Sequence, residues 1–283
     1  MLVGEGRSGG ALTVVNAIPT GQGAAIGLDL ETTAHVELTS EPGPVDVTVG
    51  DEPEADPSLA QACVDVVGER YDEELSGTVA TDSDIPIARG LKSSSSAANA
   101  IVLAILDALD ERRDPELVLE LGLAAARQAG VTVTGALDDA AASLLGGLVV
   151  TDNREDEILR RKPLGASRPV LLLVPTSRRF TADVDDLDQA RPASEHALDR
   201  LAEDDWPTAL TLNGLGVAAA LGSPMDPAYR ALTAGAQAAG LSGTGPATGA
   251  VCSEQATAAV RGAWQPYNSP IITTGTRDGE VAR

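Results

Sequence analysis

Lysine and aromatic side chains are scarce in this chain of 283 residues. Lys92 and Lys162 are its only lysines, and Phe, Trp and Tyr together make up 2% of the residues. The 42 Asp and Glu outnumber the 20 Lys and Arg, which gives a formal net charge of −22. Nucleic acids and anionic lipid surfaces are bound by clustered Lys and Arg, so the composition excludes a broad binding face for either. It is typical of proteins that work in concentrated salt, which screens repulsion among carboxylates.

Cysteine and histidine are also few. Cys63 and Cys252 are isolated and form no CxxC pair, which fits a reducing compartment without disulfides. His35 and His196 are too few and too far apart in sequence to suggest a metal cluster. No basic segment followed by an apolar run opens the chain, and the longest nearly apolar stretch, 97–109, is shorter than the roughly 20 residues of a membrane-spanning helix. We therefore expect a soluble, cytoplasmic protein.

Strand-like and helix-like segments interleave along the chain, which predicts a two-domain α+β or α/β protein. The charged run 152–162 is the best candidate boundary, so we place the domains at 1–155 and 156–283. Alternation and short apolar runs predict strands over 11–18, 28–38, 45–49, 75–80, 148–151, 170–174, 247–252 and 270–274. Helical periodicity and caps predict helices over 58–71, 93–109, 115–130, 137–145, 194–203, 207–221, 227–239 and 254–264.

The most informative segment is the loop before the helix predicted from Ser93. Its small residues allow a phosphate chain to approach the helix N-terminus, where free N–H groups and the helix dipole attract anions. Gly90 gives the turn conformational freedom, and Lys92 adds a mobile positive charge. An ordinary serine-capped helix explains the serines alone equally well. The loop is no Walker A motif, because G-x-x-x-x-G-K-[ST] occurs nowhere in the chain.

Two further loops could carry chemistry. Asp138 and Asp139 stand at the start of a short helix, where one carboxylate could accept a proton and the other could hold a metal ion. A capping role explains them at least as well when they are taken alone. In the loop 241–249, Gly243 and Gly245 permit close approach of a ligand to the backbone, although a tight connection without a ligand has the same sequence. A serine hydrolase is disfavoured, because neither His35 nor His196 lies near a serine-rich motif in the sequence.

Together these loops resemble the GHMP kinase superfamily, named for galactokinase, homoserine, mevalonate and phosphomevalonate kinases. Its motif P-x-x-x-G-L-x-S-S is matched by Pro86, Gly90, Leu91, Ser93 and Ser94, and its C-terminal glycine motif by 242–245. Within the superfamily, the segments 15–23, 88–95 and 131–139 are most similar to the shikimate kinase family of archaea, here in a halophilic form. The likeness extends from about residue 4 to 275.

The resemblance implies an α+β chain of the GHMP kinase fold, with a ribosomal protein S5 domain 2-like N-terminal domain and a ferredoxin-like C-terminal domain. It implies ATP and Mg²⁺ as cofactors and ATP-dependent phosphorylation of the shikimate 3-hydroxyl, a step toward aromatic amino acids. Shikimate and ATP would be the partners of a monomer or homodimer. By likeness, the catalytic residues would be Asp138 as the base, and Lys92; the metal ligands would be Ser94 and Asp139. The expected ATP-binding residues are Pro86, Ile87, Ala88, Arg89, Gly90, Leu91, Lys92, Ser93, Ser94, Ser95 and Ser96. The expected substrate-binding residues are Asn16, Thr20, Gly21, Gly23, Ser242, Gly243, Thr244 and Gly245.

Two positions depart from the family pattern. Mevalonate kinases have a magnesium-binding Glu 11 residues before the catalytic Asp, and this chain has Arg127 there. The metal would then depend on Asp139, or on phosphate oxygens and water alone. Lys92 replaces a small residue of many relatives but agrees with the shikimate kinase branch. Arg89, Arg178 and Arg179 are candidates for binding the substrate carboxylate, and surface ion pairing explains each of them as well. Alternative functions are another kinase of this superfamily, acting on homoserine or mevalonate, and a non-catalytic ATP-binding protein.

Overall fold

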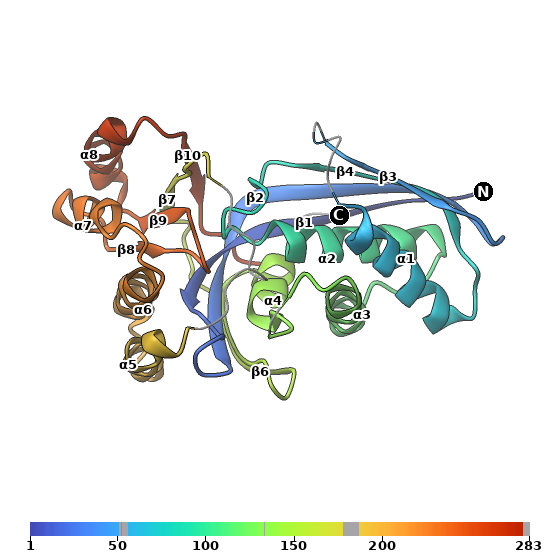
Figure 1. Cartoon of the computed structure of the whole chain (residues 1–283), viewed down its shortest axis with the longest axis horizontal. Helices are drawn as coiled ribbons and strands as arrows, with labels where there is room; N and C mark the ends of the chain where they lie inside the picture. The colour runs from blue at the N-terminus through green and yellow to red at the C-terminus, as the bar shows by residue number, and fades with distance from the viewer. Residues whose placement is uncertain (51, 53–55, 133, 178–186, 280–283) are drawn as a thin grey trace.

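The first half of the chain forms a sheet covered by helices on one face (Figure 1). The computed structural model describes residues 1–50, 52, 56–132, 134–177 and 187–279. In this part of the chain, β1 (Leu2–Val15) and β2 (Gln22–Thr39) pair as a long antiparallel hairpin. The sheet continues in the order β3-β4-β2-β5-β6, where β3 is Val45–Val49, β4 Ser76–Ser83, β5 Leu148–Asp152 and β6 Glu157–Lys162.

Three helices pack on this first sheet: α1 (Ser58–Tyr71), α2 (Ser93–Ala108) and α4 (Leu137–Leu145). The helix α3 (Pro115–Gln128) packs on these three helices. Local sequence explains where α3 begins, because the Asp114 side chain accepts a hydrogen bond from the Glu116 N–H and Pro115 occupies the first turn. Helix α2 is apolar on nearly every side, so it is buried between the sheet and the other helices. Gly6 of β1 lets α2 lie directly on the strand, since a Cβ there would be 2.2 Å from the Ala100 carbonyl oxygen.

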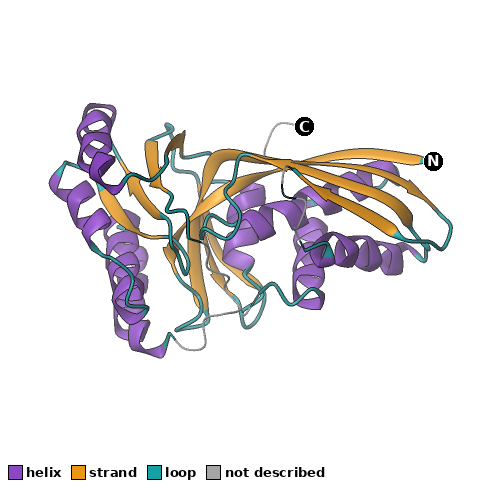
Figure 2. Cartoon of the chain, turned by 45° about the horizontal axis from the view of Figure 1, so that its top comes forward, coloured by secondary structure: helices purple, strands orange, loops and turns teal. Residues whose placement is uncertain are grey.

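The second half forms an antiparallel sheet of its own. Its strands are β7 (Pro169–Leu173), β8 (Ala238–Leu241), β9 (Thr248–Val251) and β10 (Ile271–Gly275), in the order β10-β7-β9-β8. The helices α5 (Arg191–Ala202), α6 (Trp206–Ala220), α7 (Asp226–Thr233) and α8 (Glu254–Trp264) lie on its outer side (Figures 1 and 2), with short 3₁₀ turns at Asp188–Ala190 and Gln265–Tyr267. Counted within this sheet, the strand order is 4-1-3-2, the ferredoxin-like arrangement. The expected α+β fold is confirmed.

A shared apolar core joins the two sheets. Leu12, Leu28 and Leu148 of the first sheet belong to the same buried cluster as Leu172 and Leu210 of the second half. This common core brings the loop before α2 close to the β8–β9 loop. No helix in the described ranges is long and apolar enough to cross a membrane.

The structure corrects three of the element predictions. The helix expected over 227–239 ends at Thr233, and residues 238–241 form β8. Gly235 has φ +99° and breaks the helix, and the short apolar run after it is buried on both faces, a context that periodicity cannot distinguish from a helix. The strands β5 and β6 form a hairpin, and the charged run 152–162 contains its turn and its second strand. The strand β6 is a charged strand at the edge of the sheet. The first sheet thus continues past residue 155 to Lys162. The first two strands also start earlier than expected, at Leu2 and Gln22.

We predict that Gly6→Ala lowers the free energy of unfolding by about 1–3 kcal/mol. The added Cβ would overlap backbone atoms of α2, which cannot rotate away as a side chain can. Gly262→Ala is the matched control, because a Cβ in this α8 position meets nothing within 4 Å. It should stabilise the protein by about 0.5–1 kcal/mol through helix propensity. Urea unfolding of both variants measures the difference, and equal stabilities would contradict the close packing of α2 on β1.

Candidate active site

Three loops from distant parts of the sequence meet where the two sheets face each other. The Ser242 hydroxyl donates to the Gly90 carbonyl at 2.7 Å, and the Ala247 N–H donates to the Arg89 carbonyl at 3.1 Å. The β8–β9 loop is therefore hydrogen-bonded to the loop that precedes α2. Gly90 has φ +79°, and a Cβ there would lie 2.2 Å from the Ser242 carbonyl oxygen. Only glycine fits this crossing of the two loops.

Lys92 connects this loop to α4. Its Nζ lies 3.0 Å from Oδ2 of Asp139, and the two side chains are only 9% and 16% exposed. Gly243 of the β8–β9 loop leaves the space that the ammonium group fills, since a Cβ there would be 2.8 Å from Nζ. The N-terminal ends of α2 and α4 are thus joined by one ion pair beside the glycine loop.

Asp138 is the buried acid of the site, with 4% of its surface exposed. Its Oδ1 accepts a hydrogen bond of 2.8 Å from Nδ2 of Asn153. Its carboxylate also lies against Gly23 of β2, where a Cβ would be 2.6 Å from both Cγ and Oδ2. Burial, and next the negative charge of Asp139, raise the pKa of Asp138 to about 7, while Lys92 and the Asn153 hydrogen bond act in the opposite direction. A carboxyl with a pKa near neutrality is suited to accept a proton in catalysis.

Asp139 is also suited to hold a cation. Its Oδ1 is buried and has no hydrogen-bond partner among the residues that the structure describes. A carboxylate oxygen is a ligand that Mg²⁺ prefers, so the residue fits the metal that the family resemblance implies. Arg127, at the position of the family's magnesium-binding Glu, forms an ion pair of 2.5 Å with Asp156 and its guanidinium lies against Gly135. It supplies no metal ligand.

The structure separates the serines at the start of α2. Ser94 is exposed, and Ser93 and Ser95 are partly exposed, in the first turn of the helix. Ser96 is fully buried and donates to the Ser8 carbonyl at 3.2 Å, which directs its hydroxyl into the interior. Leu91 likewise belongs to the apolar core. We therefore keep Ser93–Ser95 and leave the side chains of Ser96 and Leu91 out of the candidate site.

The other expected ATP-binding and carboxylate-binding residues lie in or near the same loop. Pro86, Ile87, Ala88 and Arg89 are partly exposed. Arg89 donates to the Thr176 carbonyl at 2.7 Å, which anchors the loop to the end of β7. Arg178 and Arg179 fall outside the described residues.

The expected substrate-binding residues divide into two groups. Gly23 contacts Asp138, and Gly243 contacts Lys92. In contrast, Asn16 Oδ1 accepts from the Ile18 N–H at 2.9 Å and Thr20 Oγ1 donates to the Gln22 carbonyl at 3.0 Å. These two side chains shape the β1–β2 turn.

The remaining expected residues support the same loops. A Cβ at Gly21 would be 2.5 Å from Nε of Arg154, so this glycine lies beneath the arginine. Ser242 and Thr244 are buried, and the Ser242 hydroxyl bonds the Gly90 carbonyl. A Cβ at Gly245 would be 2.7 Å from the Leu241 side chain.

The sequence interpretation missed the residues that follow β5. Asn153 contacts Asp138 directly, and Arg154 binds Asp152 through both Nε and a terminal nitrogen, at 3.1 and 2.7 Å. These hydrogen bonds hold the pKa of Asp152 well below its usual range. The available signal was a buried strand that ends in the polar residues 151–153, although their distance from Asp138 in the sequence is set only by the fold.

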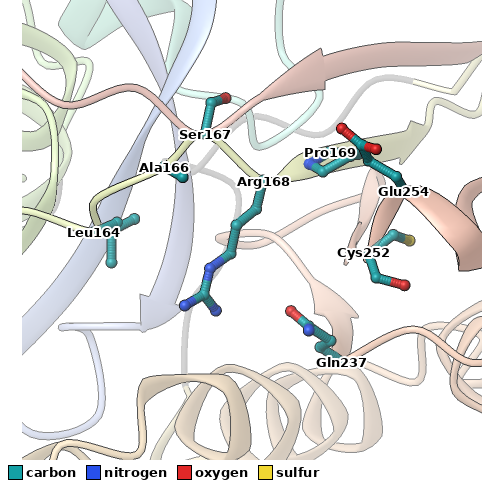
Figure 3. Close-up of a pocket in the computed structure, with 9 residues that line it drawn as sticks. Leu164, Ala166, Ser167, Arg168, Pro169, Gln237, Cys252 and Glu254 are labelled. Atoms are coloured by element: carbon teal, nitrogen blue, oxygen red, sulfur yellow. The ribbon is translucent and has the colours of Figure 1, made fainter.

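A separate cavity of about 330 Å³ lies at the start of β7 and the end of β9 (Figure 3). Arg168 points into it toward Gln237, and the Arg168 guanidinium lies 5.3 Å from the Trp206 ring centroid. Its lining residues include one base, Arg168, and one acid, Glu254, and none of the expected site residues. Asp138, Asp139, Lys92 and the β8–β9 loop lie together at the candidate site described above, and none of them lines this cavity. No group of three His, Cys, Asp or Glu suited to a metal occurs in the described ranges.

Comparison with known proteins agrees with this geometry. Residues 58–147 match the family model of the GHMP kinases N terminal domain. The chain is 43% identical over 259 residues to a shikimate kinase of Methanosarcina acetivorans, covering 90% of this chain and 87% of that protein. It is 44% identical over 269 residues to a shikimate kinase of Halobacterium salinarum, covering 94% of each.

Solved structures show the same fold at low sequence identity. The mevalonate kinase of Methanococcus jannaschii superposes with a TM-score of 0.78 at 14% identity, covering 98% of each chain. The homoserine kinase of Cytophaga hutchinsonii gives a TM-score of 0.74 at 20% identity, covering 98% of this chain and 95% of that one. The fold and the three loops define a small-molecule kinase of the GHMP type. Within that class, the chain belongs to the shikimate kinase family.

We predict that Gly23→Ala lowers kcat by about 10- to 100-fold, because a methyl group would displace the Asp138 carboxylate and small misplacements of a reacting group are costly. Steady-state kinetics with ATP and the acceptor measure the effect. Gly262→Ala serves again as the control for an added methyl group and should keep the wild-type kcat. A Gly23→Ala protein with full activity would show that Asp138 does not need its present position.

A second prediction concerns the stability cost of the buried acid. A carboxyl whose pKa rises on folding binds its proton more tightly in the folded state, so stability falls as the pH rises from about 4 to about 7. Asp138→Asn cannot ionise and should be more stable than the wild type by roughly 1–4 kcal/mol at pH 8. The difference should narrow as the pH falls toward 5. Denaturant unfolding in metal-free, concentrated salt at both pH values tests this, and a gain that does not change with pH would contradict it.

Proposed function

We propose that this protein transfers the γ-phosphoryl group of ATP to the 3-hydroxyl of shikimate. The observation that carries the proposal is the Lys92–Asp139 ion pair, which holds the N-terminus of α2 beside the buried acid Asp138. The shikimate kinases that the chain resembles over nine-tenths of its length support the choice of acceptor. A phosphate-binding helix end and a proton acceptor are the two parts that such a transfer requires.

The triphosphate would bind at the first turn of α2. The N–H groups there have no partner within the helix, and the dipole places partial positive charge at this end. Ser93, Ser94 and Ser95 are accessible for hydrogen bonding, and Lys92 adds a full charge that neutralises the transferring group. Ser94 and Asp139 would hold Mg²⁺, which on binding supplies further charge neutralisation at the phosphate oxygens.

Asp138 would act as the base for the acceptor. Its carboxylate takes the proton of the 3-hydroxyl while the acceptor oxygen forms its bond to the γ-phosphorus. The bond between that phosphorus and the β,γ-bridging oxygen breaks, and ADP leaves with the bonding electrons. The β1–β2 turn with Gly23 and the β8–β9 loop with Gly243 flank Asp138 and Lys92, so they are the proposed walls of the acceptor site. Alignment and charge neutralisation are the main tasks of the protein in this reaction.

An acceptor panel tests the proposal. In concentrated salt with Mg²⁺ and ATP, shikimate should release ADP at the highest rate, and homoserine and mevalonate should give little. Phosphorus NMR should identify the product as shikimate 3-phosphate. The solved homoserine and mevalonate kinases share only the fold with this chain, at 20% and 14% identity. Preferred turnover of either compound, or ATP binding without turnover of any, would overturn the assignment.

Asp138→Asn should lower kcat by at least 100-fold, the usual scale for losing a general base. The KM for ATP should change little, because the proposed phosphate contacts lie on α2. Asp199→Asn, at an exposed position on α5, is the matched control for removing one negative charge and should keep the wild-type rate. Equal activity of the two variants would show that Asp138 is not the base.

A further inference from the structure

A short chain of buried polar side chains ends on Asp138. Thr151, the penultimate residue of β5, is fully buried, and Asn153 just beyond the strand is 4% exposed. The Thr151 hydroxyl donates to Oδ1 of Asn153 at 2.6 Å. Asn153 Nδ2 in turn donates to Oδ1 of Asp138 at 2.8 Å and to Oγ1 of Thr134 at 3.2 Å. The Asn153 oxygen thus faces a hydroxyl donor, and its nitrogen faces acceptors.

Thr151 holds the Asn153 amide from the end that does not face the acid. An amide has one accepting oxygen and one donating nitrogen. Because the oxygen accepts the Thr151 proton, the nitrogen is directed at Asp138 and Thr134. The same hydroxyl lies 3.5 Å from the Gly23 carbonyl, a longer contact than the 2.6 Å to Asn153. Both side chains are buried, and a hydrogen bond in the low-dielectric interior is stronger than one at the surface.

The two oxygens of Asp138 consequently have different surroundings. Oδ1 is held by Asn153, and Oδ2 lies over Gly23 beside the β1–β2 turn. Thr134 also precedes α4, so Asn153 connects the start of that helix to its acid. We propose that Asn153, oriented by Thr151, is a positioning residue that holds Oδ1 of Asp138 and leaves Oδ2 to accept the proton of the substrate hydroxyl. This inference rests on the proposed role of Asp138 as the base.

The proposal predicts a loss of kcat with unchanged substrate affinity. Asn153→Ala should lower kcat about 10- to 100-fold, because the carboxylate loses its fixed orientation. Thr151→Val keeps the shape of the side chain but leaves Asn153 Oδ1 without its donor, so the amide is held less firmly against Asp138, and kcat should fall about 5- to 10-fold. Thr151→Ser restores the hydroxyl and should recover most of that loss. The KM values for ATP and shikimate should stay within about twofold, because these residues act through Asp138.

Thr32→Val is the matched control. Thr32 is also a buried threonine of the first sheet, and its hydroxyl is 2.7 Å from that of Ser83 in β4. The variant loses a buried hydroxyl of the same kind without touching the chain that leads to Asp138, so it should keep the wild-type kcat. If Asn153→Ala fails to fold, the Thr151→Val and Thr151→Ser pair decides the question.

The outcomes separate this inference from the proposed function. Absence of shikimate turnover by the wild type overturns the proposed function and this inference with it. With wild-type turnover present, the positioning role alone is overturned by any of three results: Thr151→Val with wild-type kcat, Thr151→Ser no more active than Thr151→Val, or an effect confined to KM. A kcat loss that Thr151→Ser reverses, at constant KM, supports it.

Discussion

The arrangement of the candidate site depends first on the ion pair between Lys92 and Asp139. It joins the N-termini of α2 and α4, two helix ends that both carry partial positive charge. Without Asp139, the ammonium group would meet two positive helix ends, and without Lys92, two adjacent carboxylates would repel each other. The glycine loop can close over this point because Gly243 has no side chain to displace Nζ. The first turn of α2 and a buried acid are thereby kept next to each other although they lie 45 residues apart.

The Lys92–Asp139 ion pair is largely buried, so salt affects it differently from the charges on the protein surface. With a net charge of −22, the molecule repels an anionic nucleotide unless salt screens its surface. Screening is effective for exposed charges and much weaker for buried ones. Lys92 and Asp139 are 9% and 16% exposed, so concentrated salt can reduce the surface repulsion while the local field of the site persists. A chain with only two lysines has one of them at this position.

Asp138 is a carboxyl group held in surroundings that disfavour its charged form. Burial beside another carboxylate raises its pKa to about 7, and only the Lys92 charge and hydrogen bonds oppose that shift. The supporting residues come from three places: Asn153 after β5, Gly23 in β2, and Lys92 before α2. Asn153 binds Oδ1 and Gly23 lies against Oδ2, while Lys92 acts on Asp138 through its charge.

Local elements were predictable wherever a short pattern decides them. The helices over 58–71 and 137–145 have the predicted bounds, and α3 begins at its Asp-Pro cap, because caps and periodicity act within a few residues. β8 was missed because a short apolar run fits a helix or a buried strand equally, and only its partner β9 makes it a strand. β6 lies in the charged run that the sequence pattern indicated as a candidate domain boundary, because an edge strand tolerates charge on its exposed face.

The sequence by itself determined the kinase family, the glycine- and serine-containing loop before α2 and the acidic pair at the start of α4, because each depends on contiguous residues. Only the tertiary structure decided that Lys92 pairs with Asp139, that Ser96 turns inward, and that Asn153 holds Asp138. These contacts join residues that are 15 to 88 positions apart. The packing of α2 and α4 on the sheet brings these residues together, and it is driven by the burial of apolar side chains. The polar contacts that result leave no signal in the local sequence.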